Sequence, residues 1–248
     1  MHRFYVENEA IHGESIYITG SDVNHIKNVL RMKPEDSLMI SNGQGKEYNC
    51  IIKDISESKV LVNIVSCEES LTELDTKIYL FQGLPKKDKM ELIIQKAVEL
   101  GVYEIIPVMM KRTIVKLEDK KKELKKLERW QQIAVSAAKQ SNRGIIPKVH
   151  EVVSYKEALK LADDMDMVLL PYENAKGIEE TKRIITQCRD KKSIGVFIGP
   201  EGGFDQNEIE EAIAREVNLI TLGRRILRTE TAGLTILSIL MFELEEDR

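Results

Sequence analysis

Beyond residue 75 the sequence alternates apolar segments of strand length with amphipathic segments of helix length, and no other feature constrains the fold as strongly. Regular β/α alternation is typical of a mostly parallel sheet whose faces are covered by helices. The expected strands of this sheet are Lys77–Gln82, Glu104–Val108, Met167–Pro171, Ser193–Gly199 and Asn218–Leu222. A helix from about Lys87 is expected to end at Gly101, because glycine favours helix C-termini.

The first 72 residues have a different pattern, in which short strand-like segments follow one another with turn residues between them. These expected strands are Arg3–Val6, Ile16–Thr19, Ser37–Ser41, Glu47–Ile55 and Lys59–Ser66. One helix, capped by Ser21 or Asp22, interrupts them. The pattern predicts a small β-barrel, followed by a polar linker at residues 68–73. We therefore expect two domains, residues 1–72 and residues 73–248.

Composition excludes several classes of protein. With 248 residues, of which 42% are apolar, the chain can bury a substantial core. No apolar segment reaches the ~18 residues of a membrane span, and the first residues do not resemble a signal peptide, so we expect a cytoplasmic protein. The cysteines and histidines are too scattered to predict a disulfide framework or a metal site. The net charge of −4 argues against a protein that coats nucleic acid non-specifically.

A glycine-rich loop, Gly199–Phe204, follows one expected strand and precedes an expected helix. Asp205 with Glu208 three residues later forms a capping pattern, so this region has the strand–loop–helix layout of a nucleotide-type ligand site. The loop lacks the features of both phosphate-binding motifs and places Glu201 where a pyrophosphate would lie. A neutral or cationic ligand that contains adenosine, such as S-adenosylmethionine, suits these residues better. The alternative is that the glycines serve only the geometry of the turn.

A second loop, residues 222–228, carries three arginines between the last expected strand and the last expected helix. Guanidinium groups suit the recognition of a phosphate or of a developing anion, although these arginines could instead pair with the acidic residues 243–247. A third loop, residues 169–173, also follows a strand. Open α/β sheets bind ligands at the carboxyl ends of their strands, so the three loops together predict a ligand site.

Two helical segments allow more than one interpretation. The basic run from Lys120 to Arg129 is either a solvated helix, since Glu123 and Glu128 can pair with its lysines, or a contact for RNA. The last helix, from about Thr231, is apolar on nearly every side, which predicts burial within its domain or in a subunit interface. Because one domain rarely hides so much apolar surface, we expect a homodimer.

The loop motifs Gly-Pro-Glu-Gly-Gly at 199–203 and Leu-Gly-Arg-Arg-Ile-Leu-Arg-Thr-Glu-Thr-Ala at 222–232 closely resemble those of the uracil-N3 methyltransferases of small-subunit (16S) ribosomal RNA, in the trefoil-knot (SPOUT) superfamily. Four further segments resemble signatures of that family: 2–5, 25–32, 83–89 and 95–101. The resemblance implies a PUA-like β-barrel, a knotted α/β domain with a mostly parallel sheet, a homodimer and S-adenosylmethionine as cofactor. Knots are nearly absent from protein folds, so the sequence pattern alone does not predict one.

The resemblance also assigns functional residues, because the knotted carboxyl-terminal chain forms the cofactor pocket in this superfamily. The expected cofactor-binding residues are Pro171, Gly199, Glu201, Gly202, Leu222, Gly223, Ile226, Leu227 and Arg228. The residues expected to contact RNA are Arg3, His25, Arg31, Lys86, Lys89 and Arg143. The chain departs from the family pattern at Lys139, where a glutamate is frequent, and at Arg224, where a proline is frequent.

Methylation at uracil N3 requires N3 to lose its proton before or during attack. The resulting anion spreads onto the flanking carbonyl oxygens, where a guanidinium would stabilise it. Arg228 is the first candidate for this role and Arg143 the second. Glu201 or Glu230 is a candidate general base. Alternatively, Glu230 only caps the last helix and Glu201 only holds its loop.

Two other functions compete with methylation of 16S ribosomal RNA or of the small ribosomal subunit. A knotted methyltransferase could act on another RNA, such as transfer RNA, because the sequence does not fix the target. The chain could also be a non-catalytic RNA-binding module, in which the α/β domain is a scaffold without a ligand. The intact loop motifs favour an enzyme.

Overall fold

The computed structural model describes residues 1–115, 119–175 and 177–245. Contacts between its residues divide the chain into two compact units. The first consists of Met1–Glu73 together with Ala138–Ile146, and the second contains the other described residues from Leu74 onward. The segment 138–146 thus belongs to the first unit, although the sequence places it far beyond the expected domain boundary at residues 72 and 73.

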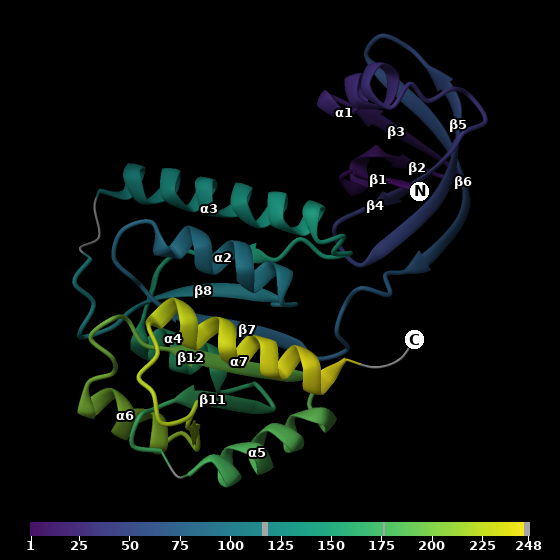
Figure 1. The fold of residues 1–248 in the computed structure, drawn as a ribbon. Helices are drawn as coiled ribbons and strands as arrows, with labels where there is room; N and C mark the ends of the chain where they lie inside the picture. Colours follow the sequence, from purple (N-terminus) through teal and green to yellow (C-terminus); the bar gives the residue numbers. More distant parts are fainter. Residues whose placement is uncertain (116–118, 176, 246–248) are drawn as a thin grey trace. The chain divides into compact units, whose positions relative to one another are not determined.

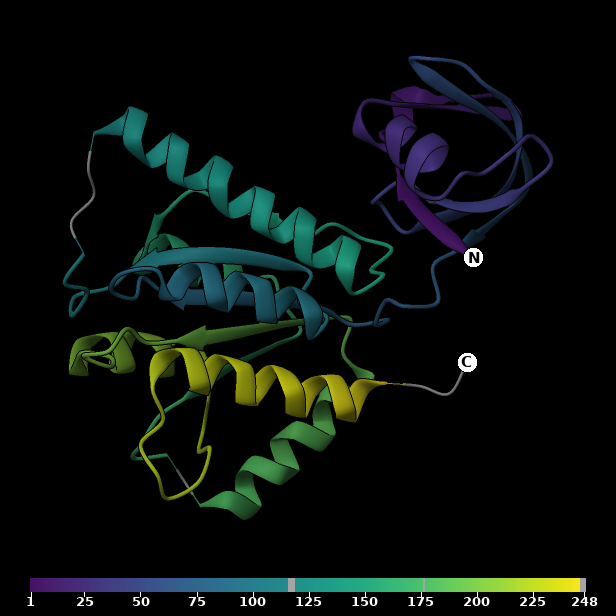
Figure 2. The same ribbon diagram turned by 45° about the horizontal axis from the view of Figure 1, so that its top comes forward.

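A curled sheet builds the first unit (Figures 1 and 2). Its strands lie in the order β1 (His2–Tyr5), β4 (Ser37–Ser41), β5 (Lys46–Ile55), β6 (Lys59–Glu69), β3 (Ser15–Thr19) and β2 (Ile11–His12). Neighbouring strands are antiparallel except for β1 and β4, which are parallel. The short helical segments are η1 (Asn8–Ala10), α1 (Ser21–Asn24) and the π-helical η2 (His25–Val29).

Burial alternates along the strands of this sheet, as expected for strands with one face on a core. Leu38 and Ile40 of β4 are fully buried while Met39 between them is half-buried, and Ile16 and Ile18 repeat the pattern in β3. The five strands expected from the sequence match β1, β3, β4, β5 and β6 to within a few residues. The two-residue strand β2 carried no pattern long enough to predict it.

A parallel sheet forms the centre of the second unit. Its strands lie in the order β10 (Val153–Ser154), β8 (Glu104–Met109), β7 (Lys77–Gly83), β12 (Ser193–Ile198), β11 (Met167–Pro171) and β13 (Asn218–Ile220), and β9 (Lys148–Val149) pairs with β8. Residues of β7 and β12 are buried on both faces, which is typical of a parallel sheet covered by helices on both sides. The β/α alternation and its five strands are therefore confirmed.

Helices cover the sheet in the second unit. They are α2 (Lys89–Glu99), α3 (Lys120–Gln140), α4 (Tyr155–Ala162), α5 (Ile178–Thr186) with the short η3 (Gln187–Asp190), α6 (Gln206–Ile213) and α7 (Thr229–Leu244). Helices α2 and α7 contact each other and lie side by side in Figures 1 and 2. Helix α6 begins with the expected capping box of Asp205 and Glu208. None of the described helices is both long and apolar enough to cross a membrane.

The chain enters α7 between the carboxyl ends of two central strands. Gln82 at the end of β7 is fully buried, and its side-chain amide donates to the hydroxyl oxygen of Thr229 at 2.9 Å. The Thr229 hydroxyl in turn donates to the carbonyl oxygen of Gly199, directly after β12, at 2.6 Å. These hydrogen bonds hold the start of α7 against the end of the sheet that carries the loops.

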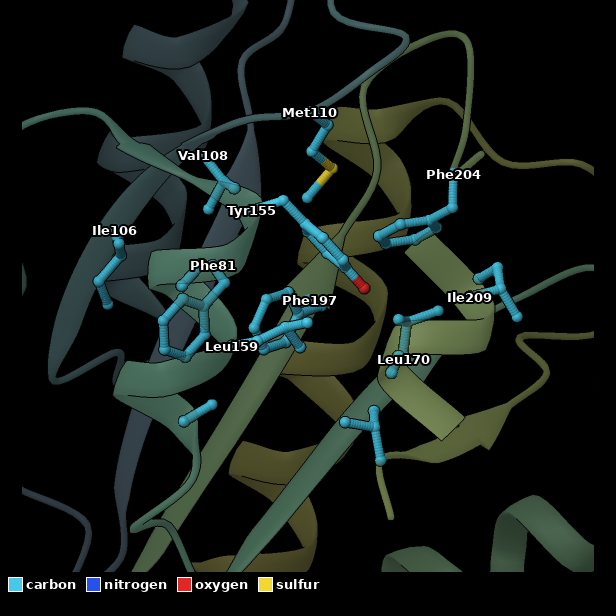
Figure 3. Close-up of a cluster of buried hydrophobic side chains, with 14 residues drawn as sticks. Phe81, Ile106, Val108, Met110, Tyr155, Leu159, Leu170, Phe197, Phe204 and Ile209 are labelled. Atoms are coloured by element: carbon cyan, nitrogen blue, oxygen red, sulfur yellow. The ribbon is translucent and has the colours of Figure 1, made fainter. Parts of the chain in front are cut away.

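Aromatic rings anchor the loop that follows β12 (Figure 3). Phe81 and Phe197 stack with their centroids 4.4 Å apart, and Tyr155 of α4 meets Phe197 edge-on at 6.0 Å. Phe204, at the end of the loop, is buried in the same cluster. The Tyr155 hydroxyl donates to the backbone carbonyl of Glu208 at 2.8 Å, and burial raises the pKa of this phenol. The far end of the 199–204 loop is therefore fixed by the core.

Candidate functional site

A pocket of about 670 Å³ lies at the carboxyl ends of β11, β12 and β13. Its walls come from residues 171–173, 198–204 and 221–229, and Lys89, Arg112, Gln206 and Ala232 also line it. The pocket therefore unites the three loops that the sequence singled out. All of the residues expected to bind the cofactor line it: Pro171, Gly199, Glu201, Gly202, Leu222, Gly223, Ile226, Leu227 and Arg228.

The 199–204 loop is folded by close backbone approaches that require glycine. An added Cβ on Gly202 would lie 3.0 Å from the Cβ of Arg112 and 3.2 Å from its carbonyl oxygen. Gly203 has a φ of +67° and its N–H donates to the carbonyl of Pro200 at 2.9 Å, which closes the turn. A side chain at 202 would thus have to displace the segment after β8 by a few tenths of an ångström, and the sequence did not predict this contact.

Charged groups tie this loop to the segment after β8. Lys111 Nζ lies 2.8 Å from Asp205 Oδ1, and the backbone N–H of Lys111 donates to Glu208 Oε1 at 2.8 Å. The Arg112 guanidinium donates to the carbonyl oxygen of Gly202 at 3.2 Å. The hydrogen bond from Lys111 lowers the pKa of Asp205, so this carboxylate stays ionised at neutral pH. Two neighbouring segments of the pocket are thereby held together.

The loop that precedes α7 is much more exposed. Gly223 has a φ of +107°, with no atom near its missing Cβ. The side chain of Ile226 is 87% exposed and the guanidinium group of Arg228 is also exposed, although both residues line the pocket. Glu243, which could have paired with these arginines, pairs instead with Arg189 at 2.7 Å, and positions 246–248 lie outside the described residues. Arg228 is therefore placed where it can face a ligand.

Glu201 and Glu230, the candidate bases, share one cation. Lys89 Nζ lies 3.2 Å from Glu201 Oε1 and 3.1 Å from Glu230 Oε2. Burial opposes ionisation of both carboxyls, but backbone hydrogen bonds and Lys89 outweigh it, so the pKa of each is lowered. A carboxylate with a lowered pKa is a weaker base than an ordinary glutamate. The geometry thus gives more support to structural roles, in which Glu201 holds its loop and Glu230, in the first turn of α7, pairs with Lys89; α7 itself has no side-chain cap.

Arg143, the second candidate for anion stabilisation, lies in the first unit and is 4% exposed. Its guanidinium donates to both carboxylate oxygens of Glu73, at distances from 2.6 to 3.1 Å. Glu73 also accepts the backbone N–H groups of Gly144 and Ile145 at 2.7 and 3.0 Å. The geometry therefore gives Arg143 a structural role in fastening the 138–146 segment, and not one in contact with a substrate. Sequence reasoning missed Glu73 because it lies in a stretch that was interpreted as a linker.

The other residues expected to contact RNA differ in how exposed their side chains are and in whether they form ion pairs. His25 in η2 and Arg31 directly after it are exposed, and Arg31 has a φ of 54°, which is rare for residues other than glycine. Lys86 is exposed as well. In contrast, Arg3 is largely buried and pairs with Glu47 at 2.8 Å. His25, Arg31 and Lys86 remain available to an external partner.

The basic run from Lys120 to Arg129 forms the first half of α3. Lys126 pairs with Glu123 at 3.0 Å, and Arg129 pairs with Glu91 of α2 at 2.8 Å. These pairs fit a solvated helix with internal charge compensation. Nothing in this geometry requires RNA.

The fold and the pocket together define a class of protein. A parallel sheet with a loop-walled pocket at the carboxyl ends of its strands is a nucleotide-type ligand site, and the chain joins it to a curled β-unit. In the part of the chain that the structure describes, no three His, Cys, Asp or Glu side chains gather in a way that could hold a metal ion.

Two family models match the chain. The RNA methyltransferase domain matches residues 72–241, and the RNA methyltransferase PUA domain matches residues 18–65. The chain is 37% identical to the ribosomal RNA small subunit methyltransferase E of Bacillus subtilis, covering 99% of this chain and 98% of that protein. It is 34% identical to the Mesomycoplasma hyopneumoniae protein of the same name, covering 96% and 98%. The chain belongs to this family of RNA methyltransferases.

Solved structures agree with this assignment. The ribosomal RNA small subunit methyltransferase E of Neisseria gonorrhoeae, bound to S-adenosylmethionine, is similar with a TM-score of 0.79 and 30% identity over 98% of this chain and 97% of that one. A methyltransferase of Legionella pneumophila in complex with the same cofactor has a TM-score of 0.77 and 32% identity, covering 96% of each chain. The expected fold class, a trefoil-knot α/β domain with a PUA-like barrel, is confirmed.

Proposed function

We propose that this protein transfers a methyl group from S-adenosylmethionine to N3 of a uridine in the 16S RNA of the small ribosomal subunit. The observation that carries the proposal is the pocket, because three loops distant in sequence converge to form it and every residue expected to bind the cofactor lines it. Relatives matched over their full length carry the name of small-subunit ribosomal RNA methyltransferases, and two similar structures hold this cofactor. The loop motifs support uracil N3 as the target.

The pocket fits the cofactor in size and in the chemistry of its walls. Its volume of about 670 Å³ lies in the range of roughly 300–1,000 Å³ that is common for small-molecule sites. Gly199, Gly202 and Gly223 line the pocket, and an added Cβ on Gly223 would meet no atom within 4 Å, so a ligand such as adenosine can approach the backbone closely there. When bound, S-adenosylmethionine supplies a methyl group on a positively charged sulfur. The residues of the chain then need to bind the cofactor and to stabilise the uracil as its N3 proton leaves.

Arg228 is the residue best placed to prepare the uracil. Its exposed guanidinium at the pocket can donate hydrogen bonds to the uracil oxygens beside N3, where negative charge collects as the N3 proton leaves. Transfer of that proton to Glu201 or Glu230 is uphill, because the pKa of each is lowered. Arg228 therefore has to be hydrogen-bonded to the uracil oxygens before the N3 proton leaves, so that it stabilises the anion as the anion forms.

The first unit supplies the contact with RNA in this proposal. The PUA-domain match, residues 18–65, includes β4, β5 and most of β6, together with the exposed residues His25 and Arg31. RNA-binding surfaces use cations that pair with phosphates, such as the guanidinium of Arg31, and rings that stack on bases, such as the imidazole of His25. Removal of residues 1–72 is expected to weaken RNA binding strongly while leaving the pocket residues in place.

We also propose that the protein is a homodimer located in the cytoplasm. Helix α7 leaves Phe242 83% exposed and Ile239 38% exposed, and Leu92 on the neighbouring α2 is 44% exposed. Exposed apolar side chains on two helices that contact each other favour a subunit interface. Light scattering at micromolar concentration tests this, and a monomer would contradict it.

The test of the proposed function is methyl transfer with isotope-labelled S-adenosylmethionine. Small subunits and 16S RNA from a strain without this activity are the substrates, and transfer RNA from the same strain is the comparison. Nucleoside digestion with mass spectrometry is expected to find the label in 3-methyluridine of 16S RNA. Label in transfer RNA or in another base would indicate a different target, and binding of RNA without transfer would indicate a non-catalytic module.

A further inference from the structure

The ammonium group of Lys89 joins three elements at the border of the pocket. Lys89 is the first residue of α2, Glu201 lies in the loop after β12, and Glu230 lies in the first turn of α7. The two ion pairs measure 3.2 and 3.1 Å. Lys89 and Glu201 both line the pocket, so this contact forms part of its wall.

Lys89 also separates two carboxylates that would otherwise repel each other. Both contact the same nitrogen, so their nearest oxygens are no further apart than the two ion-pair distances together. Glu230 Oε2 is buried, and among the described residues it has no hydrogen-bond partner of good geometry besides this ion pair. Like charges at such a distance disfavour ionisation, and a buried carboxylate without a counter-ion is costly.

The other charges nearby do not replace this lysine. Arg228 acts on Glu230 from the entry of α7 without an ion-pair contact, and Lys86 reaches Glu201 only through its backbone N–H, at 3.1 Å. On the outer side of α2, Glu91 is occupied by Arg129 of α3. Within residues 1–115, 119–175 and 177–245, Lys89 is the cation that pairs with either carboxylate.

We propose that Lys89 is a positioning residue of the cofactor site, whose ammonium group holds the 199–204 loop against the start of α7 in the conformation that binds S-adenosylmethionine. The inference rests on the proposed cofactor. Lys89 acts through Glu201 and Glu230 and not on the reacting atoms. Lys89 was expected to contact RNA, whereas its two ion pairs and its place in the pocket wall assign it to the cofactor site.

Calorimetric titration of the full chain with S-adenosylmethionine and with its neutral product S-adenosylhomocysteine tests the proposal. Lys89→Met is expected to weaken both ligands by about tenfold to a hundredfold at pH 8, because charge-assisted contacts of this kind are lost. Without the lysine, the pKa of the carboxylate pair rises. Lowering the pH to 5 then protonates one carboxylate, removes the repulsion and restores several-fold of the affinity. Lys89→Arg, which keeps the charge, should stay within about fivefold of the native protein.

Matched variants separate this role from a general loss of stability. Lys96→Met lies on the same helix, where its ion pair with Glu99 measures 2.8 Å, and it should leave both affinities unchanged. Lys89→Met combined with Glu230→Gln removes the repulsion between the two carboxylates and should bind better than Lys89→Met alone. This double variant also gives a result if the single variant folds poorly. Affinities within threefold of native in Lys89→Met at pH 8, or equal losses at pH 5 and pH 8, would overturn the proposal. Failure of the native protein to bind either ligand would instead overturn the proposed cofactor.

Discussion

Gly202→Ala should weaken the binding of S-adenosylmethionine, because the added methyl group would press against Arg112 of the protein itself. The added Cβ would lie 3.0 Å from Arg112 Cβ and 3.2 Å from the Arg112 carbonyl oxygen, so the loop or the 111–112 segment has to move by a few tenths of an ångström. Overpacking of this kind costs about 1–3 kcal/mol. If the bound conformation of the loop bears that cost, the Kd for S-adenosylmethionine rises by about 5- to 150-fold. Gly202→Val should abolish measurable binding, because its branched side chain is larger still.

Calorimetry with S-adenosylmethionine measures the effect, and thermal unfolding shows whether the variant stays folded. Gly177→Ala is the control, because an added Cβ there meets no atom within 4 Å and its φ is negative. We expect a shift in Tm of less than about 12 °C for Gly202→Ala, since the cost is about 1–3 kcal/mol and 1 kcal/mol corresponds to about 2–4 °C in a chain of this size. A folded Gly202→Ala protein whose Kd stays within twofold of native would refute this account of the loop.

Three further predictions concern other parts of the molecule. Glu73→Gln should lower the free energy of unfolding by about 3–5 kcal/mol, because it removes the carboxylate charge that pairs with the buried Arg143. Urea denaturation measures this change, and a loss below about 0.5 kcal/mol would contradict the structural role of the pair. Arg228→Ala should slow single-turnover methylation by about tenfold to a thousandfold, with poor rescue by lysine, and an unchanged rate at saturating RNA and cofactor would exclude it from the mechanism. Gly233→Ala should raise the free energy of unfolding by about 0.5–1 kcal/mol, because an added Cβ inside α7 meets Gln82 Oε1 at an ordinary 3.5 Å; destabilisation would show that this helix has no room there.

Local patterns predicted the strands well, because a strand buried on one face alternates apolar and polar residues and a strand buried on both faces is apolar along its length. The strand of residues 77–82 and its partner at 193–199 are almost uniformly apolar, as strands covered on both faces must be. The helix expected from Lys87 begins two residues later, at Lys89. Lys87 has a φ of 56°, in the left-handed region, and nothing in its residue type indicates that conformation.

Contacts between distant residues could not be predicted in the same way. Arg143 and Glu73 are 70 positions apart, and neither lies in a pattern that indicates its partner, so the assignment of segment 138–146 to the first unit was missed. The site shows the same limit. The glycine-rich loops were recognised as a ligand site. The absence of a side chain at Gly202 was attributed to close approach of the ligand, whereas the close contact with Arg112 already favours glycine there. The knot, finally, came from the family resemblance, since no periodicity encodes the path of a chain through a loop.

The last helix was expected to be buried on several sides, and the structure shows why its sequence is ambiguous. Its residues Ile236, Leu237 and Leu240 are fully buried against the rest of the second unit, while Phe242 points to solvent. A helix that is apolar all round has one face for its own core and another that needs a partner. The sequence indicates the total apolar surface but not how it divides between the two.

Titration of the native protein with S-adenosylmethionine and, separately, with ATP tests the central claim that the three loops form a site for a methyl-donor cofactor. The loop after β12 presents the carboxylate of Glu201 and lacks a phosphate-binding motif, so it should accept the first ligand and reject the second. We predict micromolar affinity for S-adenosylmethionine and no heat of binding for ATP at millimolar concentration. Absence of S-adenosylmethionine binding at millimolar ligand, or tighter binding of ATP, would contradict the account.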